Sequence, residues 1–133
     1  MQDYRNLRVW GAARKLAVEV ARAFPLRSRR AIPELRSQAI RAARSVSSNI
    51  VEGCSRSSSL EFLNFLERSL GSLNELEDHL LFAHDVGTIT SETHAKLIAQ
   101  LVLTRRMLIS FLRPVQRAAA EEAARRRERR RKG

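Results

Sequence analysis

Residues 58–87 read SSLEFLNFLERSLGSLNELEDHLLFAHDVG, and this stretch decides the fold. Apolar or small residues recur in it at alternating steps of four and three, which places them on one face of an α-helix. Ser58 lies three residues before Glu61, a spacing at which each residue bonds a free backbone amide at a helix start. The sequence predicts a helix from Ser58 through to Gly87, roughly 42 Å long at 1.5 Å per residue. Its core-facing stripe is Phe62, Leu66, Ser69, Leu73, Leu76, Leu80 and Ala83.

Three further segments show the same apolar period. The first covers residues 7–24 and is ended by Pro25. The second covers residues 33–52, with proline at its first position and Gly53 expected to close it in the left-handed conformation. Residues 88–90 begin the fourth, which Pro114 is expected to kink or end. The stripes are Trp10, Ala13, Ala17, Val20 and Phe24 in the first, Leu35, Ala39, Ala42, Val46 and Ile50 in the second, and Leu97, Leu101, Thr104, Leu108, Phe111 and Val115 in the fourth.

These four segments predict an all-α protein. Four helices joined by short loops pack most economically as an antiparallel up-down-up-down four-helix bundle, because each stripe is then buried against its neighbours. A length of 133 residues fits one domain. We expect the bundle to span residues 1–116 and a basic C-terminal extension, helical or disordered, to span residues 117–133.

The sequence indicates a cytoplasmic protein without a membrane span. The single cysteine, Cys54, has no partner for an internal disulfide, and neither end of the chain shows a secretory signal pattern. Residues 97–112 form the most apolar segment. Arg105 and Arg106 interrupt it, and it is shorter than the roughly 20 apolar residues that cross a bilayer.

The charge is strongly basic and unevenly distributed. Lysine and arginine total 25 against 14 acidic residues, a net charge of +11, and 22 of the basic residues are arginine. A GC-rich genome would explain arginine in place of lysine but not the excess of positive charge, which is typical of proteins that bind polyanions. Residues 1–56 carry a net +8, residues 57–112 carry −3 and residues 113–133 carry +6. A basic half beside an acidic one also suits assembly of identical subunits.

Twelve arginines are the candidate nucleic-acid-binding residues. Arg36, Arg41 and Arg44 are expected to share one broad polar face of the second helix, beside the arginines of the 26–32 loop. The tail after Ala118 has no apolar stripe to bury, so we expect it to be partly frayed when free and to order on phosphates. Such contacts give steep salt dependence with little sequence readout, and a single tryptophan and tyrosine make base stacking a poor candidate. The twelve are Arg27, Arg29, Arg30, Arg36, Arg41, Arg44, Arg125, Arg126, Arg127, Arg129, Arg130 and Arg131.

The sequence offers no pattern for catalysis or metal binding. No glycine-rich phosphate loop follows a strand, and Cys54 has no histidine partner that spacing defines. Glu75 and His79 lie one helical turn apart, but the paired Glu and Glu-x-x-His units of bundle metal sites are missing. We expect a protein that is not an enzyme and that carries no cofactor, metal or catalytic residue.

Several motifs resemble those of a known family. They are NLRVW at residues 6–10, FP at 24–25, RAARSVSSNIVEG at 41–53 after Gln38, EF at 61–62 and GSLNE at 71–75. Over residues 4–112 they are similar to the four-helix bundle proteins encoded in intervening sequences of bacterial 23S ribosomal RNA genes. That family resembles the accessory variability determinant of diversity-generating retroelements, a homopentamer that binds nucleic acid and a reverse transcriptase. The resemblance implies a homopentamer without known catalysis, and it does not extend to the arginine tail.

The motif residues have structural interpretations of their own. Trp10 fits a bundle-core anchor, and Gly71 with Ser69 and Ser72 forms a small face that permits close helix approach. Asn49 and Glu52 lie beside an apolar stripe, so we expect buried hydrogen bonds from them to Arg41, Arg44 or backbone amides. On this interpretation Glu52→Ala lowers the melting temperature.

Two functions compete. The leading one is a homo-oligomeric protein that binds RNA or DNA through arginine–phosphate contacts. The alternative is an adaptor that recruits another protein, such as a reverse transcriptase. Attraction of the tail to anionic lipid is a weaker possibility, because the tail has no apolar face.

Self-assembly is expected because the apolar surface exceeds what one stripe per helix explains. The surplus residues are Leu60, Leu63, Leu70, Leu81, Ile98, Val102, Ile109 and Leu112.

Overall fold

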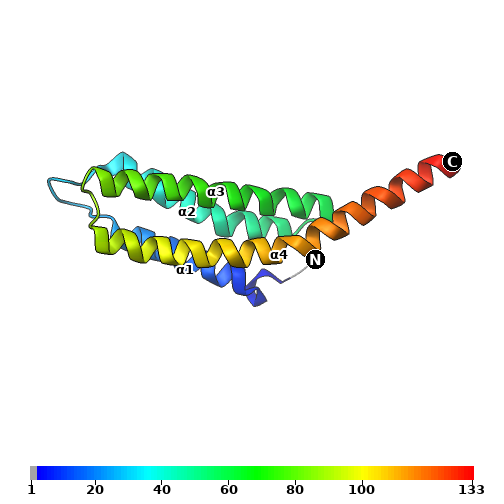
Figure 1. Cartoon of the computed structure of the whole chain (residues 1–133), viewed down its shortest axis with the longest axis horizontal. Helices are drawn as coiled ribbons and strands as arrows, with labels where there is room; N and C mark the ends of the chain where they lie inside the picture. The colour runs from blue at the N-terminus through cyan, green and yellow to red at the C-terminus, as the bar shows by residue number, and fades with distance from the viewer. Residues whose placement is uncertain (1–2) are drawn as a thin grey trace.

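The protein is a bundle of four helices (Figure 1). The computed structural model describes residues 3–133. A short 3-10 turn, η1 (Tyr4–Asn6), precedes α1 (Arg8–Ala23), α2 (Pro33–Cys54), α3 (Ser59–Asp85) and α4 (Ser91–Lys132). Each helix packs against two others in the order α1, α2, α3, α4 and back to α1. The predicted all-α four-helix bundle is confirmed.

The predicted stripes of α2 and α3 form much of the core. All five positions of the α2 stripe are buried, and so are all positions of the α3 stripe except Phe62, which is half-buried. In α4, Leu112 is buried in place of Phe111 and Val115, so it belongs to the core rather than to the surplus apolar surface.

The core face of α1 agrees with the prediction at Ala13, Val20 and Phe24 and departs from it at two positions. Val9, Ala12 and Leu16 are buried, whereas Trp10 and Ala17 are only half-buried. Trp10 is therefore a partly buried residue that packs against the core, not a fully buried one. Its indole lies at the edge of the bundle, where it packs against the Tyr4 ring with the ring centroids 5.2 Å apart.

The helix starts show the serine half of the expected capping box at α3 and a threonine cap at α4. Ser58 Oγ accepts a hydrogen bond from the Glu61 backbone N–H at 3.1 Å, and Thr90 Oγ1 accepts one from the Thr93 N–H at 3.1 Å. These side chains satisfy amides that have no partner within the helix. Gly87 follows α3 with φ of +78°, the left-handed conformation that a residue with a Cβ rarely adopts.

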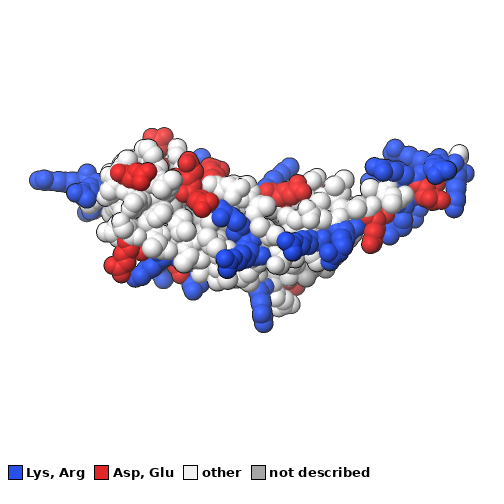
Figure 2. Space-filling view, in the orientation of Figure 1, with Lys and Arg blue, Asp and Glu red and all other residues white. Residues whose placement is uncertain are grey.

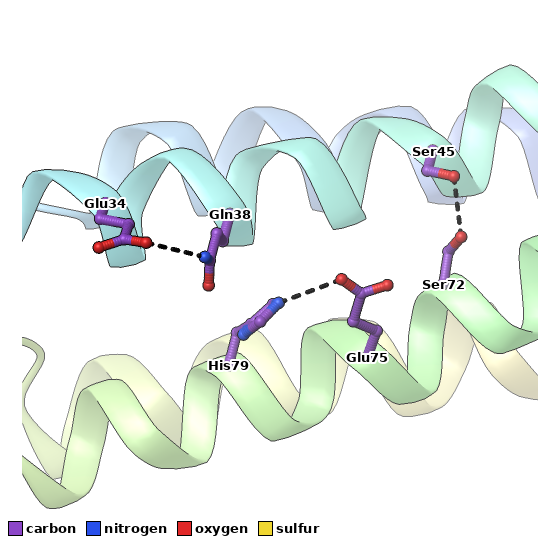
Figure 3. Close-up of polar contacts among 6 residues, drawn as sticks. All are labelled: Glu34, Gln38, Ser45, Ser72, Glu75 and His79. Carbon is purple, nitrogen blue, oxygen red and sulfur yellow. Dashed lines mark hydrogen bonds and ion pairs between the residues drawn. The ribbon is translucent and has the colours of Figure 1, made fainter.

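Two glycines play roles other than those predicted. Gly53 lies inside α2 without a positive φ, and a Cβ there would be 2.7 Å from Phe62 Cδ1, so its small size is needed for the contact of α2 with α3. Gly71 is exposed, and a Cβ there would meet nothing within 4 Å. The close approach instead uses Ser69, whose Oγ donates to the Val46 carbonyl at 2.6 Å, and Ser72, whose Oγ lies 2.8 Å from Ser45 Oγ (Figure 3).

The tail is the continuation of α4. The helix runs through Pro114 to Lys132, and its last turns leave the bundle and project beyond it (Figure 1). Pro114 does not end the helix. It has no backbone N–H and so removes one hydrogen bond, but helical turns continue on both sides of it. Ala119 is still buried, so contact with the bundle extends past the predicted boundary at residues 116–117. Residues 1 and 2 of the predicted bundle range lie outside the described part.

None of the helices described between residues 3 and 133 combines the length and the apolar character needed to cross a membrane.

Candidate nucleic-acid interface

An open groove of about 560 Å³ runs between α1 and α2. We call it the α1–α2 groove. The wall from η1 and α1 carries Tyr4, Trp10 and Arg14, and the wall from α2 carries Arg44, Ser47, Ser48 and Glu52. Five apolar residues also line the groove, and we call them its floor: Ala17, Val18, Ala21, Ile40 and Val51.

An aromatic pair and a cation form the first wall. The Tyr4 and Trp10 rings meet edge to face at 64°. The Arg14 guanidinium carbon lies 5.8 Å from the Trp10 ring centroid, within the range of a cation–π contact. Neither Tyr4 nor Arg14 is among the binding residues predicted from the sequence. The spacing of Trp10 and Arg14, four residues apart on one helix face, was the available signal.

Arg44 joins the groove to a second, smaller depression that is lined by α2 alone. That depression, about 480 Å³, is lined by Ser37, Ile40, Arg41, Arg44, Ser45 and Ser48. Arg14, Arg41 and Arg44 are exposed. The ion pairs found among residues 3–133 all involve other side chains, so these three guanidinium groups are not neutralised by a carboxylate.

Arg36 does not share this exposed surface. It is half-buried, and its Nη2 donates a hydrogen bond to the Ala21 carbonyl of α1 at 3.3 Å. Its Nε is buried without a protein partner in the described chain. Arg36 therefore ties α2 to α1, whereas Arg41 and Arg44 face solvent.

The loop arginines lie at one end of the bundle. Arg27, Arg29 and Arg30 are exposed in the connection between α1 and α2. The Arg30 carbonyl accepts a hydrogen bond from Thr88 Oγ1 at 2.8 Å, which fixes this loop against the turn between α3 and α4. Figure 2 shows basic groups at this end and a second, larger collection at the opposite end, so the loop and tail arginines form separate clusters.

The tail arginines form the densest basic cluster. Arg125, Arg126, Arg127, Arg129, Arg130 and Arg131 are exposed on the part of α4 that projects from the bundle (Figure 2). Three of them, Arg125, Arg126 and Arg129, line a small depression with Ser57 and Ser58 at the start of α3.

Glu122 fixes the root of this cluster. Both of its carboxylate oxygens lie 3.2 Å from the Ser59 backbone nitrogen, and they accept its hydrogen bond. Hydrogen bonding to Ser59 lowers the pKa of the Glu122 carboxyl, and the nearby Arg126 and Arg125 lower it further. A negative charge at a helix N-terminus is stabilising, because the free amides there carry partial positive charge.

Asn49 and Glu52 have different roles. Asn49 Nδ2 donates to the Ser45 carbonyl at 2.8 Å and to Ser45 Oγ at 3.0 Å, which continues the hydrogen-bonded chain to Ser72. Glu52 is exposed, and its Oε2 accepts from Arg56 Nη2 at 2.9 Å. The expectation of a buried Glu52 is wrong, because the residue points away from the α2 stripe and towards the α1–α2 groove.

Two histidines make polar contacts, and the cysteine is buried. His84 Nδ1 lies 3.3 Å from Asp85 Oδ1 and its Nε2 lies 2.9 Å from Ser91 Oγ, and its ring stacks on that of His94 with the centroids 5.0 Å apart. His79 Nε2 lies 3.3 Å from Glu75 Oε1 (Figure 3). Within residues 3–133, no three side chains of histidine, cysteine, aspartate or glutamate gather in a group that could hold a metal ion. Cys54 is buried, and burial raises the pKa of its thiol, which disfavours the reactive thiolate.

Comparison with known proteins finds a family and a related fold. The family model described as 23S rRNA-intervening sequence protein matches residues 5–110. A crystal structure of a protein of unknown function from the S23 ribosomal protein family of Bacteroides thetaiotaomicron is similar over 78% of this chain and 97% of its own. The TM-score is 0.72 and the sequence identity 24%, a likeness of fold. No curated protein matches the chain.

Proposed function

Because the chain belongs to the 23S rRNA-intervening sequence protein family, we propose that it is a nucleic-acid-binding bundle that works without catalysis. The observation that carries this proposal is the group of exposed arginines along the α1–α2 groove and its neighbouring depression, Arg14, Arg41 and Arg44, none of which is paired with a carboxylate among residues 3–133. The tail cluster adds a second basic surface. Guanidinium groups bind phosphate through paired hydrogen bonds, so the phosphate backbone of RNA or DNA is the proposed ligand.

We further propose that the protein is cytoplasmic and homo-oligomeric. Leu60 and Leu81 on α3 are each 50% exposed, and Leu63, Leu70, Ile98, Val102 and Ile109 on α3 and α4 are only partly covered. Covering such apolar surface favours self-association. The resemblance implies five copies, and repetition would join the arginine groups into a longer basic surface. Sedimentation at micromolar concentration tests this: Leu81→Glu should dissociate the assembly, and a monomeric wild type would contradict it.

The test of nucleic-acid binding compares two charge-matched double variants. In one, Arg41 and Arg44 are changed to alanine; in the other, Lys15 and Lys96, which already pair with Glu19 and Glu92, are changed to alanine. We expect the affinity for mixed-sequence RNA and DNA to fall linearly with salt on a double-logarithmic scale. The arginine variant should reduce the slope by about one to two units and the lysine variant by less. Binding that ignores salt would contradict the proposal.

The second candidate is an adaptor. Leu26, Phe82 and Val86 are 73%, 54% and 43% exposed, and all lie at the end of the bundle where the α1–α2 loop contacts the α3–α4 turn. Such a surface suits contact with another protein, for example a reverse transcriptase. A complex with that partner that survives nuclease treatment would favour the adaptor function, and one that nuclease dissolves would favour nucleic-acid binding.

A further inference from the structure

We propose that the α1–α2 groove binds single-stranded nucleic acid, with a base against its aromatic and apolar surface and the adjoining phosphates on Arg14 and Arg44. This inference rests on the proposed function. It adds the location of the contact and the preference for an unpaired strand. It also reverses the expectation that base stacking is a poor candidate, because the single tyrosine and the single tryptophan lie together at this groove.

The groove combines apolar and basic side chains, which match the apolar base and the charged phosphate of a nucleotide. Its floor is apolar, and Val18 remains 38% exposed there. A phosphate alone would gain nothing from such a floor, whereas the face of a base is apolar and packs on aromatic and aliphatic side chains. In a duplex the base faces are already stacked and inaccessible. An unpaired strand therefore matches the groove better than a duplex does.

Cations border the apolar floor on both sides. Arg14 belongs to the α1 wall and Arg44 to the α2 wall, and both are exposed. A phosphate on either side of a bound base would meet a guanidinium group. Arg14 also lies over the Trp10 ring, so it can contact a base and a phosphate together.

Hydrogen-bond acceptors complete the α2 wall. The Ser47 and Ser48 hydroxyls each donate to the Arg44 carbonyl, at 3.1 and 2.7 Å, which leaves their oxygens able to accept. Glu52 adds a carboxylate, which accepts hydrogen bonds from base amino groups and repels phosphate. The backbone of the strand is thus directed towards the arginines, and the base edge towards the acceptors.

The surface continues beyond one nucleotide. Ile40, Arg44 and Ser48 line both the groove and the neighbouring depression that holds Arg41. A strand that leaves the groove past Arg44 therefore meets Arg41 next. Two of the sequence motifs meet here as well, because residues 6–10 supply Trp10 and residues 41–53 supply the opposite wall.

Trp10 is the only tryptophan, so its fluorescence reports on the groove directly. The probes are oligouridylate, oligodeoxythymidylate, a blunt DNA duplex of equal charge, and heparin, a polyanion without bases. We expect the single strands to quench Trp10 emission to saturation. Heparin and the duplex should bind with much smaller changes in emission.

Two matched variants separate the groove from general charge attraction. Val18→Glu places a negative charge on the groove floor, and Leu103→Glu places one at a similarly exposed apolar position on α4. We expect Val18→Glu to weaken single-strand binding about tenfold, a loss of the size seen when one base contact is removed. Leu103→Glu should weaken it far less. Circular dichroism melting identifies any variant that fails to fold.

The outcomes distinguish this inference from the proposed function. If oligonucleotides bind with normal salt dependence but leave Trp10 emission unchanged, the groove assignment is wrong and the proposed function stands. Equal weakening by the two glutamate variants would overturn the assignment in the same way. If Trp10 emission instead changes with protein concentration alone, a second copy occupies the groove. If no probe binds, both proposals fail.

Discussion

The carboxylate of Glu122 caps α3 through the backbone nitrogen of Ser59, 63 positions earlier in the chain. Helix α3 thus takes a cap from the tail of α4 in addition to its own Ser58. This contact holds the last helix against the bundle beyond Pro114 and sets the direction in which the arginine cluster projects.

Glu122→Gln should loosen this cap. Because the pKa of the Glu122 carboxyl is lowered in the folded protein, its contribution to stability is present above the ordinary pKa of glutamate. The contribution is lost as the pH falls through the lowered value. Hydrogen exchange of the Ser59 amide should therefore be faster in the variant at neutral pH and similar in both proteins in strong acid. Equal exchange at neutral pH would show that the cap contributes nothing.

Gly53→Ala and Gly71→Ala should change stability in opposite directions. The new Cβ at residue 53 would meet Phe62 at 2.7 Å and Phe65 Cβ at 3.2 Å, so we expect a loss of about 1–3 kcal/mol. At residue 71 the Cβ meets nothing, and alanine should stabilise the exposed helix by up to about 1 kcal/mol. Chemical denaturation measures both; destabilisation by Gly71→Ala would indicate a close contact in the assembly.

Ser69→Ala should cost about 1 kcal/mol of unfolding free energy. Its fully buried hydroxyl donates to the Val46 carbonyl at 2.6 Å, and alanine leaves that carbonyl without this donor. Ser48→Ala is the control, because Ser48 is exposed and bonds only within its own helix. Similar denaturation midpoints for the two variants would contradict the assignment.

Arg36→Ala and Arg41→Ala should separate stability from binding. Arg36 joins α2 to the Ala21 carbonyl of α1, so its loss should lower the unfolding free energy by about 1–2 kcal/mol and leave the salt dependence of binding nearly unchanged. Arg41 is exposed, and its loss should do the reverse. Melting curves and salt titrations on the same preparations measure the two effects. Equal effects of the two substitutions on binding would contradict the separate roles of Arg36 and Arg41.

Glu52→Ala should change stability by less than about 0.5 kcal/mol. The exposed pair of Glu52 with Arg56 is of the kind that contributes little in water. This replaces the expectation, drawn from the sequence, that the substitution lowers the melting temperature. A melting temperature several degrees lower would show that Glu52 contributes to stability, as the sequence predicted.

Some features of the site could be predicted from the sequence and others could not. Arg41 and Arg44 were identified because charged residues opposite an apolar stripe face solvent. Arg36 was assigned to the same surface, yet it bonds the neighbouring helix. Trp10 was assigned to the core because periodicity does not distinguish a buried aromatic residue from one at the edge of the stripe.

The sequence alone determined the four helices, their order and most of the buried stripe. These features depend on contacts within a few residues: the 3.6-residue period, the Ser58 and Thr90 caps, and the turn at Gly87. Tertiary structure alone decided that Gly53 faces Phe62, that Glu122 caps α3, and that Trp10 and Arg44 border one groove. Each of these joins residues on different helices. The rotation and axial register of packed helices set such contacts, and they result from the fit of many side chains at once.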